Sequence, residues 1–263
     1  MTISIILNAF NRLKYIDKQI EAIKSQSIKV NEIFVWQNAY SKKNSIILPK
    51  YIKHIKSSYN FGVWTRFSLA LNCKSDYICI FDDDTIPGNN WLKNCLNTIK
   101  KKNGLLGARG VRFASDNEYI VGEEYGWNNP NNNIKEVDIV GHSWFFKREW
   151  LSYFWREIPE IASSIYVGED IHFSYILQKY LNINTYVPPH PKDDKSLWGS
   201  EPNSAIKIGT DQHAISYDKK RLDEMDKTLK YYVSNGFKCK FLQKLKYKKL
   251  YLQSKKKIRK LIK

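Results

Sequence analysis

The stretch Ile78–Asp84, ICIFDDD, places three acidic residues directly after a short apolar run. An apolar run of this length predicts a buried strand, and side chains that alternate at the end of a strand allow Asp82 and Asp84 to converge. Three adjacent carboxylates repel one another unless a cation or hydrogen-bond donors offset their charge. Mg²⁺ and Mn²⁺ prefer oxygen ligands, so the stretch predicts a divalent metal site. A solvated acidic turn, or a helix N-cap before Pro87, is the alternative.

Around this stretch, strand-like and helix-like segments alternate through the first hundred residues. The alternation predicts an α/β fold, in which a single domain carries a mostly parallel nucleotide-binding sheet flanked by helices. Ligands of such sheets bind beyond the C-terminal ends of the strands, where Asn8, Gln37 and Asp82 fall. The expected strands are 3–7, 32–36, 51–55 and 76–81, and the expected helices are 11–25 and 63–71.

The second half of the chain is less regular. Residues 137–146 predict another strand, and residues 149–156 the start of a helix. A further helix opens at Glu169 and Asp170, where a carboxylate could act as a general base, although acids also cap helices at this position. Residues 188–204 are rich in Pro, Gly and Ser, which predicts a long surface loop of the kind that is often functional.

The charge of the chain is unevenly distributed. The net charge is +17, and much of the excess lies in residues 237–263, where Lys and Arg alternate with apolar residues and no acid occurs. This pattern predicts a basic amphipathic helix on an anionic membrane, with a solvated tail as the alternative. No RNA-binding motif accompanies it, so nucleic acid is not an expected partner. We therefore divide the chain into a catalytic domain, 1–236, and a tail, 237–263.

The compartment is predicted from features that the chain lacks. No segment approaches the roughly 18 consecutive apolar residues of a membrane span, and the N-terminal apolar run has no basic region before it. The four cysteines form no CxxC pair or compact framework, which favours reduced thiols. These features predict a cytoplasmic protein, peripheral on the inner face of the cytoplasmic membrane if the tail binds lipid.

Six short segments follow one another along the chain: FNR at 10–12, FVWQN at 34–38, TRF at 65–67, FDDDT at 81–85, GARG at 107–110 and GEDI at 168–171. Taken in order, they resemble a GT-A glycosyltransferase, and most closely the exostosin-like family, glycosyltransferase family 64, whose pattern has a Tyr/Phe-Asn/Asp-Arg turn, VVWNN, NRF, LDDDV, an Arg-containing segment and CEDI. Glycosyltransferase family 2 is the alternative; its members usually carry an Asp after the second strand, where this chain has Gln37 and Asn38.

The resemblance implies a nucleotide-sugar donor site in the first half of the domain, 1–100. Asn11 and Arg12 would line the nucleotide pocket, with Arg12 near the diphosphate. Asn38 would contact the base, and Asn60 and Arg66 would lie beside the nucleotide or its phosphates, since a guanidinium suits phosphate. Asn8 and Gln37, at the ends of their strands, complete the expected donor set.

The resemblance also divides the acids by role. Asp84 would ligate Mn²⁺ or Mg²⁺, Asp82 would hold the ribose or assist at the metal, and Asp83 would face the donor sugar. Asp170 would be the catalytic carboxylate of the acceptor half, 101–236, and Glu169 ranks second.

The remaining candidates lie in or near the long loop. The histidines of the chain are expected to be structural, although His190 and His213 are candidate metal ligands because some GT-A enzymes take a histidine from this region. Trp198 is a candidate lid or acceptor-stacking residue, with simple packing as the alternative.

These features predict a metal-dependent glycosyltransferase that moves a sugar from a UDP-sugar to a glycan or lipid-linked glycan in bacterial capsule or lipopolysaccharide synthesis. The exostosin-like resemblance implies retention of anomeric configuration, and the family 2 alternative implies inversion. A nucleic-acid-binding module with structural acids is the competing class. A nucleotidyltransferase is disfavoured because its phosphate loop needs glycines, which ILNAFNRLKY lacks.

Overall fold

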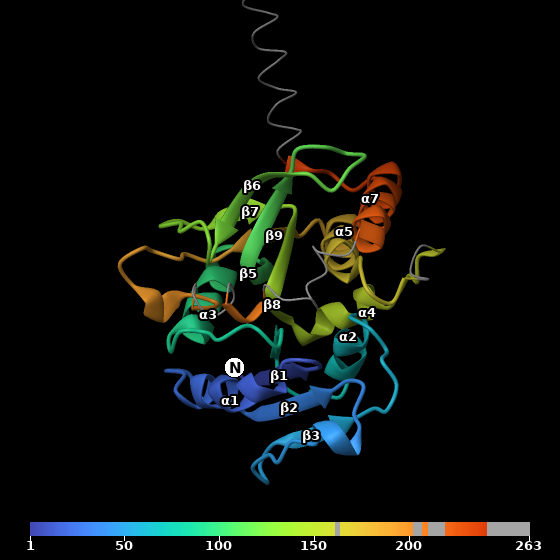
Figure 1. Cartoon of the computed structure of the whole chain (residues 1–263). Helices are drawn as coiled ribbons and strands as arrows, with labels where there is room; N and C mark the ends of the chain where they lie inside the picture. The colour runs from blue at the N-terminus through green and yellow to red at the C-terminus, as the bar shows by residue number, and fades with distance from the viewer. Residues whose placement is uncertain (161–163, 202–206, 210–218, 241–263) are drawn as a thin grey trace, which may run out of the picture.

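The computed structural model describes residues 1–160, 164–201, 207–209 and 219–240, which form an α/β domain built on one large sheet (Figure 1). The strands are β1 Ile3–Ala9, β2 Glu32–Gln37, β3 Lys53–Lys56, β4 Tyr77–Phe81, β5 Gly104–Phe113, β6 Val121–Gly126, β7 Lys135–Val137, β8 Ile139–Lys147 and β9 Asn184–Val187. The α-helices are α1 Ile16–Lys24, α2 Thr65–Ala70, α3 Trp91–Lys101, α4 Leu151–Phe154, α5 Glu169–Leu181 and α7 Lys219–Ser234.

The order of the strands is β3-β2-β1-β4-β8-β5-β9-β7, with β6 paired to β5. The four strands β3, β2, β1 and β4 are parallel, but β8 runs antiparallel to both β4 and β5. The predicted α/β class is therefore confirmed, whereas the prediction of a mostly parallel sheet holds only for the N-terminal half. The second half contains short connections such as the one between β5 and β6, and these are too short for the crossover that parallel strands require.

The strands of the first half are apolar on both faces because helices cover both sides of the sheet. Ile5, Ile6 and Leu7 of β1 are at most 1% exposed, as expected for a central parallel strand. In Figure 1, α1 lies to the left of the strands of the first half and α2 to their right, whereas α5 and α7 lie beside the strands of the second half. This packing fixes the C-terminal ends of β1 and β4 side by side, and the acidic cluster follows β4.

The start of the predicted basic tail belongs to the folded core. Phe237 and Cys239 are 3% and 5% exposed, and they pack in the cluster that joins α5 and α7. The backbone N–H of Lys240 donates to the Asp138 carboxylate at 2.6 Å; burial raises the pKa of Asp138 to about 6. The expected boundary at 236/237 thus falls inside a packed segment, and residues 241–263 lie outside the described residues.

Two further expectations concern the membrane and the cysteines. Among the described residues, we find no helix whose length and apolar character would let it span a bilayer. The four cysteines are all free and buried.

Candidate active site

The acidic cluster sits in a tightly held turn at the end of β4. The Asp82 N–H donates to the carbonyl of His142 on β8 at 3.0 Å, and the Thr85 N–H donates back to the Asp82 carbonyl at 3.1 Å. From α1, the buried Gln19 side chain donates to the carbonyls of Asp82 and Thr85, at 2.6 and 2.9 Å. The backbone that carries the three carboxylates is therefore fixed by elements from both halves of the sheet.

Asp82, Asp84 and His142 form a group that could hold a metal ion, because one ligand atom of each lies within 4.8 Å of the others. His142 has a φ of +63°, a left-handed conformation that is uncommon outside glycine and recurs at functional sites. Its Nδ1 is buried, lies 3.5 Å from Asp84 Oδ1 and has no hydrogen-bond partner among the described residues. An oxygen-rich set with one imidazole suits a divalent ion such as Mn²⁺.

The histidine beside the acids is thus His142, which we had expected to be structural, and not the predicted candidate His190. His190 is fully buried, and both of its ring nitrogens are engaged. Nδ1 lies 2.8 Å from the Pro188 carbonyl, and Nε2 accepts from the Gly199 N–H at 3.0 Å. Burial lowers the pKa of His190 to about 4, so it is a neutral structural residue. The other candidate, His213, lies outside the described residues.

Two arginines neutralise the acidic cluster. Arg12, in the turn after β1, contacts Asp83 at 2.7 Å and Asp84 at 3.8 Å. Arg66, on α2, contacts Asp82 at 2.5 Å and lies 4.0 Å from Glu169, while its guanidinium stacks over Trp144 at 4.7 Å. Both predicted phosphate-binding arginines therefore reach the acids, and Arg66 links the acidic cluster to the start of α5.

The pKa values of the cluster follow from burial and neighbouring charge. Burial raises the pKa of Asp82 and of Asp83 above the usual value, although Arg66 and Arg12 act in the opposite direction. Burial also acts to raise the pKa of Asp84, but His142 and Arg12 outweigh it and the pKa is lowered. Asp84 is therefore the acid of the three that most readily stays ionised, as a metal ligand must.

Glu169 and Asp170 open α5 on the other side of Arg66. Burial and the neighbouring Asp170 charge raise the pKa of Glu169 to about 8. Burial raises the pKa of Asp170 to about 6, against the effects of the Ile171 N–H, Arg66 and Arg109. At neutral pH, Asp170 is the member of the pair that is ionised and able to accept a proton.

The position of these acids depends on Gly168, the N-cap of α5, which has a φ of +100°. A Cβ at this position would lie 2.9 Å from the Thr228 side chain. We expect Gly168→Ala to lower the free energy of unfolding by about 1–3 kcal/mol through backbone strain and to reduce kcat by shifting both carboxylates. Urea unfolding and initial rates measure the two effects.

Gly236→Ala is the matched control for this substitution, because Gly236 has a φ of +101° but no atom near the position of its Cβ. This control should lose stability and keep its kcat. A Gly168→Ala variant with an unchanged kcat would show that the glycine does not set the position of the acids.

The predicted nucleotide residues are only partly brought together. Asn8 ends β1 with a buried Nδ2 that has no partner in the described part of the chain, and Asn11 is exposed in the following turn. Asn38 donates to Asn60 at 2.8 Å, so these two amides lie in contact. Gln37 is fully buried.

Gln37 is not placed to read a base, because its amide donates to the Asn44 carbonyl and its oxygen lies 3.0 Å from His54. The reason is the register of β2, since successive strand side chains point to opposite faces. The prediction for Gln37 is therefore corrected: the amide that remains for a nucleotide at this strand end is that of Asn38.

Trp198 does not extend into solvent from a surface loop. It is 2% exposed, its indole N–H donates to the Pro191 carbonyl at 2.8 Å, and it packs with Trp127. The backbone around Trp198 is hydrogen-bonded to residues 86–90, whereas residues 192–195 of the same predicted loop are exposed. The packing alternative for Trp198 is the one that the structure supports.

Two residues near the site had no role in the sequence analysis. Arg109 on β5 pairs with Glu124 on β6 at 2.7 Å, and its charge lowers the pKa of Asp170. Gly209 accepts a hydrogen bond from Arg12 at 3.2 Å, and a Cβ there would lie 2.3 Å from an Asp84 carboxylate oxygen. Arg109 stood in a quoted motif, whereas no sequence signal pointed to Gly209.

The site thus combines a strand-end carboxylate cluster, two flanking arginines and an acid pair at a helix start, all on an α/β sheet. A family model described as glycosyl transferase family 2 matches residues 4–158, more than half of the chain. The chain belongs to glycosyl transferase family 2, which the sequence analysis held as the alternative, and it is a glycosyltransferase. The finer resemblance to the exostosin-like family stays a prediction.

The chain is also similar to one curated protein and to several solved structures. An uncharacterized glycosyltransferase of Haemophilus influenzae is 29% identical over 151 residues, which cover 51% of this chain and 46% of the relative. The chain thus matches about half the length of that protein. The structure of S. aureus TarS 1–349 in complex with UDP has a TM-score of 0.49 at 16% identity, covering 72% of this chain and 58% of that one. The complex of the same protein with UDP-GlcNAc gives the same TM-score and identity.

Proposed function

We propose that the chain transfers a sugar from a nucleotide-sugar, of the UDP-sugar class, to a hydroxyl group of a glycan acceptor. The observation that carries this proposal is the convergence of Asp82, Asp84, His142 and two arginines on one point at the ends of β1 and β4. Parallel sheets bind nucleotides at this position. The broader setting we propose is bacterial capsule or lipopolysaccharide synthesis, in keeping with the glycan acceptor.

Asp84, Asp82 and His142 would hold a divalent cation, Mn²⁺ or Mg²⁺. The fit rests on the three converging ligand atoms and on the buried, unpartnered His142 Nδ1. When bound, such an ion offsets the charge that builds on a leaving diphosphate. Arg12 and Arg66, which neutralise the acids in this structure, would contact the diphosphate oxygens, and Asp83 would then be free to face the sugar.

For the reaction itself we propose inversion, as the family 2 alternative implies. The acceptor hydroxyl oxygen attacks the anomeric carbon on the face opposite the diphosphate. The bond from that carbon to the diphosphate oxygen breaks, its electron pair leaves with the diphosphate, and the hydroxyl proton passes to the Asp170 carboxylate. A pKa of about 6 suits this role, because the group is ionised at neutral pH and still basic enough to take a proton.

A donor screen tests the proposal. UDP-, GDP-, dTDP- and CMP-sugars are each incubated with the full chain and Mn²⁺. In the absence of an acceptor, water slowly replaces it, and proton NMR identifies the anomer of the free sugar that is released first. We expect turnover of a UDP-sugar, dependent on the metal, with an inverted product. A retained product would favour the exostosin-like mechanism, and absence of UDP binding with Mn²⁺ would reject the donor class.

We further propose that the basic residues of the tail hold the enzyme on the inner face of the cytoplasmic membrane, where a lipid-linked acceptor would be presented. The support is the composition of residues 241–263, in which basic and apolar residues are interspersed without an acid. Cosedimentation with phosphatidylglycerol vesicles tests it, and equal sedimentation with purely zwitterionic vesicles would contradict it.

A further inference from the structure

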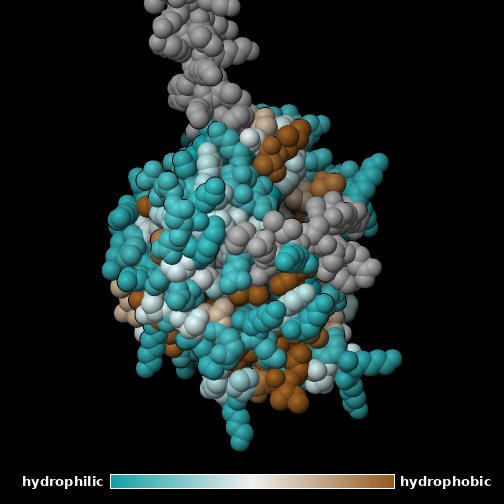
Figure 2. All heavy atoms as spheres, turned by 60° about the vertical axis from the view of Figure 1, so that its left-hand side comes forward, coloured by the Kyte–Doolittle hydropathy of each residue, from teal (hydrophilic) through white to brown (hydrophobic). Residues whose placement is uncertain are grey.

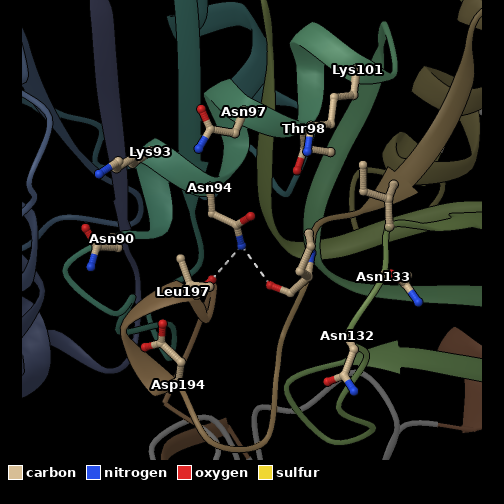
Figure 3. Close-up of a pocket in the computed structure, with 12 residues that line it drawn as sticks. Asn90, Lys93, Asn94, Asn97, Thr98, Lys101, Asn132, Asn133, Asp194 and Leu197 are labelled. Atoms are coloured by element: carbon tan, nitrogen blue, oxygen red, sulfur yellow. Dashed lines mark hydrogen bonds between the residues drawn. The ribbon is translucent and has the colours of Figure 1, made fainter.

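A polar cavity lies on the α3 side of the molecule, outside the catalytic cluster. It has a volume of about 660 Å³, which falls in the range of roughly 300–1,000 Å³ that is typical of small-molecule sites. Figure 3 shows its walls: α3 on one side, the loop at Asp194 and Leu197 below, and the turn at Asn132 and Asn133 opposite. None of the catalytic candidates lines it.

The wall formed by α3 is a stripe of polar residues at helical spacing. Asn90, Asn94, Asn97 and Thr98 all line the cavity, and residues three and four apart share one face of a helix. Asn94 is buried, and its Nδ2 donates to the carbonyls of Pro189 and Leu197 at 2.7 and 2.9 Å. This amide joins the helix to the loop and makes the cavity a formed feature of the fold.

The Asn90 amide donates to the Ser196 hydroxyl at 3.0 Å, but three other amides around the cavity have no protein partner among the residues that the structure describes. Asn97, Asn132 and Asn133 are exposed, and within the described residues no hydrogen bond is formed by their side chains. Asn131, the neighbour of Asn132, shows the contrast, because it is buried and its side chain donates to the Asn133 and Pro188 carbonyls at 2.9 Å. Three amides, each with donors and an acceptor, therefore face one hollow with their hydrogen-bonding capacity unused.

The side chains that line the cavity indicate that its ligand is a sugar. Amides and a hydroxyl offer paired donors and acceptors that suit the adjacent hydroxyl groups of a sugar, and Ile134, Pro189 and Leu197 provide apolar surface for the C–H groups of a sugar ring. A lipid would need a continuous apolar surface, but the face that carries α3 is mostly hydrophilic (Figure 2). Lys93 and Lys101 at the rim also accommodate an acidic substituent.

We propose that this cavity is a second glycan-binding subsite, which holds a part of the glycan chain away from the reacting end. The proposal rests on the function proposed above in one respect, namely that the glycan is the acceptor of the transfer reaction. Binding of a sugar chain in this cavity requires neither a donor nor catalysis. Such a subsite would keep a growing chain at the enzyme between transfers and raise the effective concentration of its acceptor end.

The backbone connects this cavity to the catalytic cluster. The loop that forms its floor accepts two hydrogen bonds from the segment after Asp84: the Gly88 N–H donates to the Trp198 carbonyl at 2.9 Å, and the Asn90 N–H donates to the Ser196 carbonyl at 2.8 Å. The same segment continues into α3. The proposed subsite and the carboxylates are thus built on one continuous piece of chain.

The test compares glycan binding by the full chain and by Asn97→Ala/Asn133→Ala on an array of defined neutral and acidic bacterial oligosaccharides, without donor or metal. We expect the full chain to bind at least one oligosaccharide and the double variant to bind it about tenfold more weakly, as the loss of two hydrogen bonds implies. Asn103→Ala, an exposed asparagine just beyond α3, is the matched control and should bind normally. Asp84→Asn should also bind normally, since it lies outside the cavity.

Equal binding by the native chain and the double variant, or absence of any bound oligosaccharide, would overturn the proposal. Failure of the donor screen with normal glycan binding would instead count against the proposed function alone. Circular dichroism of the double variant checks that it is folded, and both substituted side chains are exposed, so the fold should be kept.

Discussion

Asp84→Asn should lower the transfer rate by about a thousandfold and remove the effect of Mn²⁺ on UDP binding. The substitution keeps the size of the side chain but removes the charge of the one acid in the cluster whose pKa is lowered. A metal that stabilises a leaving diphosphate contributes several kcal/mol, and about 4 kcal/mol corresponds to a thousandfold in rate. Titration calorimetry of UDP with and without Mn²⁺, together with initial rates, measures both effects.

The controls for this substitution distinguish the loss of a metal ligand from the general effect of removing one negative charge. Asp193→Asn makes the same chemical change at an exposed loop position and should behave as the native chain. His142→Asn should weaken the response to Mn²⁺ without removing it, because two carboxylates remain. If Asp84→Asn still shows UDP binding enhanced by Mn²⁺, the ion is held elsewhere and the assignment of the metal site fails.

Asp170→Asn is expected to lower kcat by about 10²–10⁴-fold, the usual contribution of a general base, with little change in UDP binding. Asparagine keeps the shape of the N-terminal turn of α5 but cannot accept the proton of the acceptor hydroxyl. Steady-state kinetics with varied acceptor, beside titration of UDP, distinguishes a chemical defect from a donor-binding defect.

The same carboxylate predicts the acid side of the pH profile. Because burial raises the pKa of Asp170 to about 6, the base is ionised above this value and becomes protonated as the pH falls through it. We expect kcat to fall about tenfold for each pH unit below 6. This acidic decrease in kcat should disappear in Asp170→Asn.

Glu169→Gln is the matched comparison for the base. The pKa of Glu169 is raised to about 8, so this side chain is mostly protonated at neutral pH, and glutamine resembles that form. The variant should keep most of its activity, and its kcat should still fall as the pH drops below 6. A larger decrease of kcat in Glu169→Gln than in Asp170→Asn would show that Glu169, and not Asp170, is the general base.

The parts of the fold that follow from local pattern could be predicted from the sequence. The apolar run before Asp82 predicted β4, the spacing of apolar residues predicted α1, and the acids Glu169 and Asp170 marked the start of α5. The antiparallel insertion of β8 between β4 and β5 could not be predicted, because strand order depends on pairings between residues more than sixty positions apart, such as Phe81 with Ser143.

The candidate site shows the same division. The acids and arginines stood in recognisable motifs, and the structure brings them into contact. His142 was missed because it reaches Asp84 only through the β4–β8 pairing and an unusual backbone conformation, neither of which leaves a signal in a single sequence. Gln37 was misplaced because the motif gives the end of the strand but not the face that a side chain occupies.

The hydrogen bonds between residues 86–90 and the loop around Trp198 have a consequence for biosynthesis. During translation the acidic cluster is synthesised about a hundred residues before the segment around Trp198 that is hydrogen-bonded to the backbone after it, and Asp170 is synthesised in between. A nascent chain that ends near residue 187 would already contain every described residue of the candidate catalytic cluster except Gly209, yet its acidic turn would continue into an unsupported segment. The geometry for catalysis is therefore completed late in translation, after the chemistry-bearing residues have emerged.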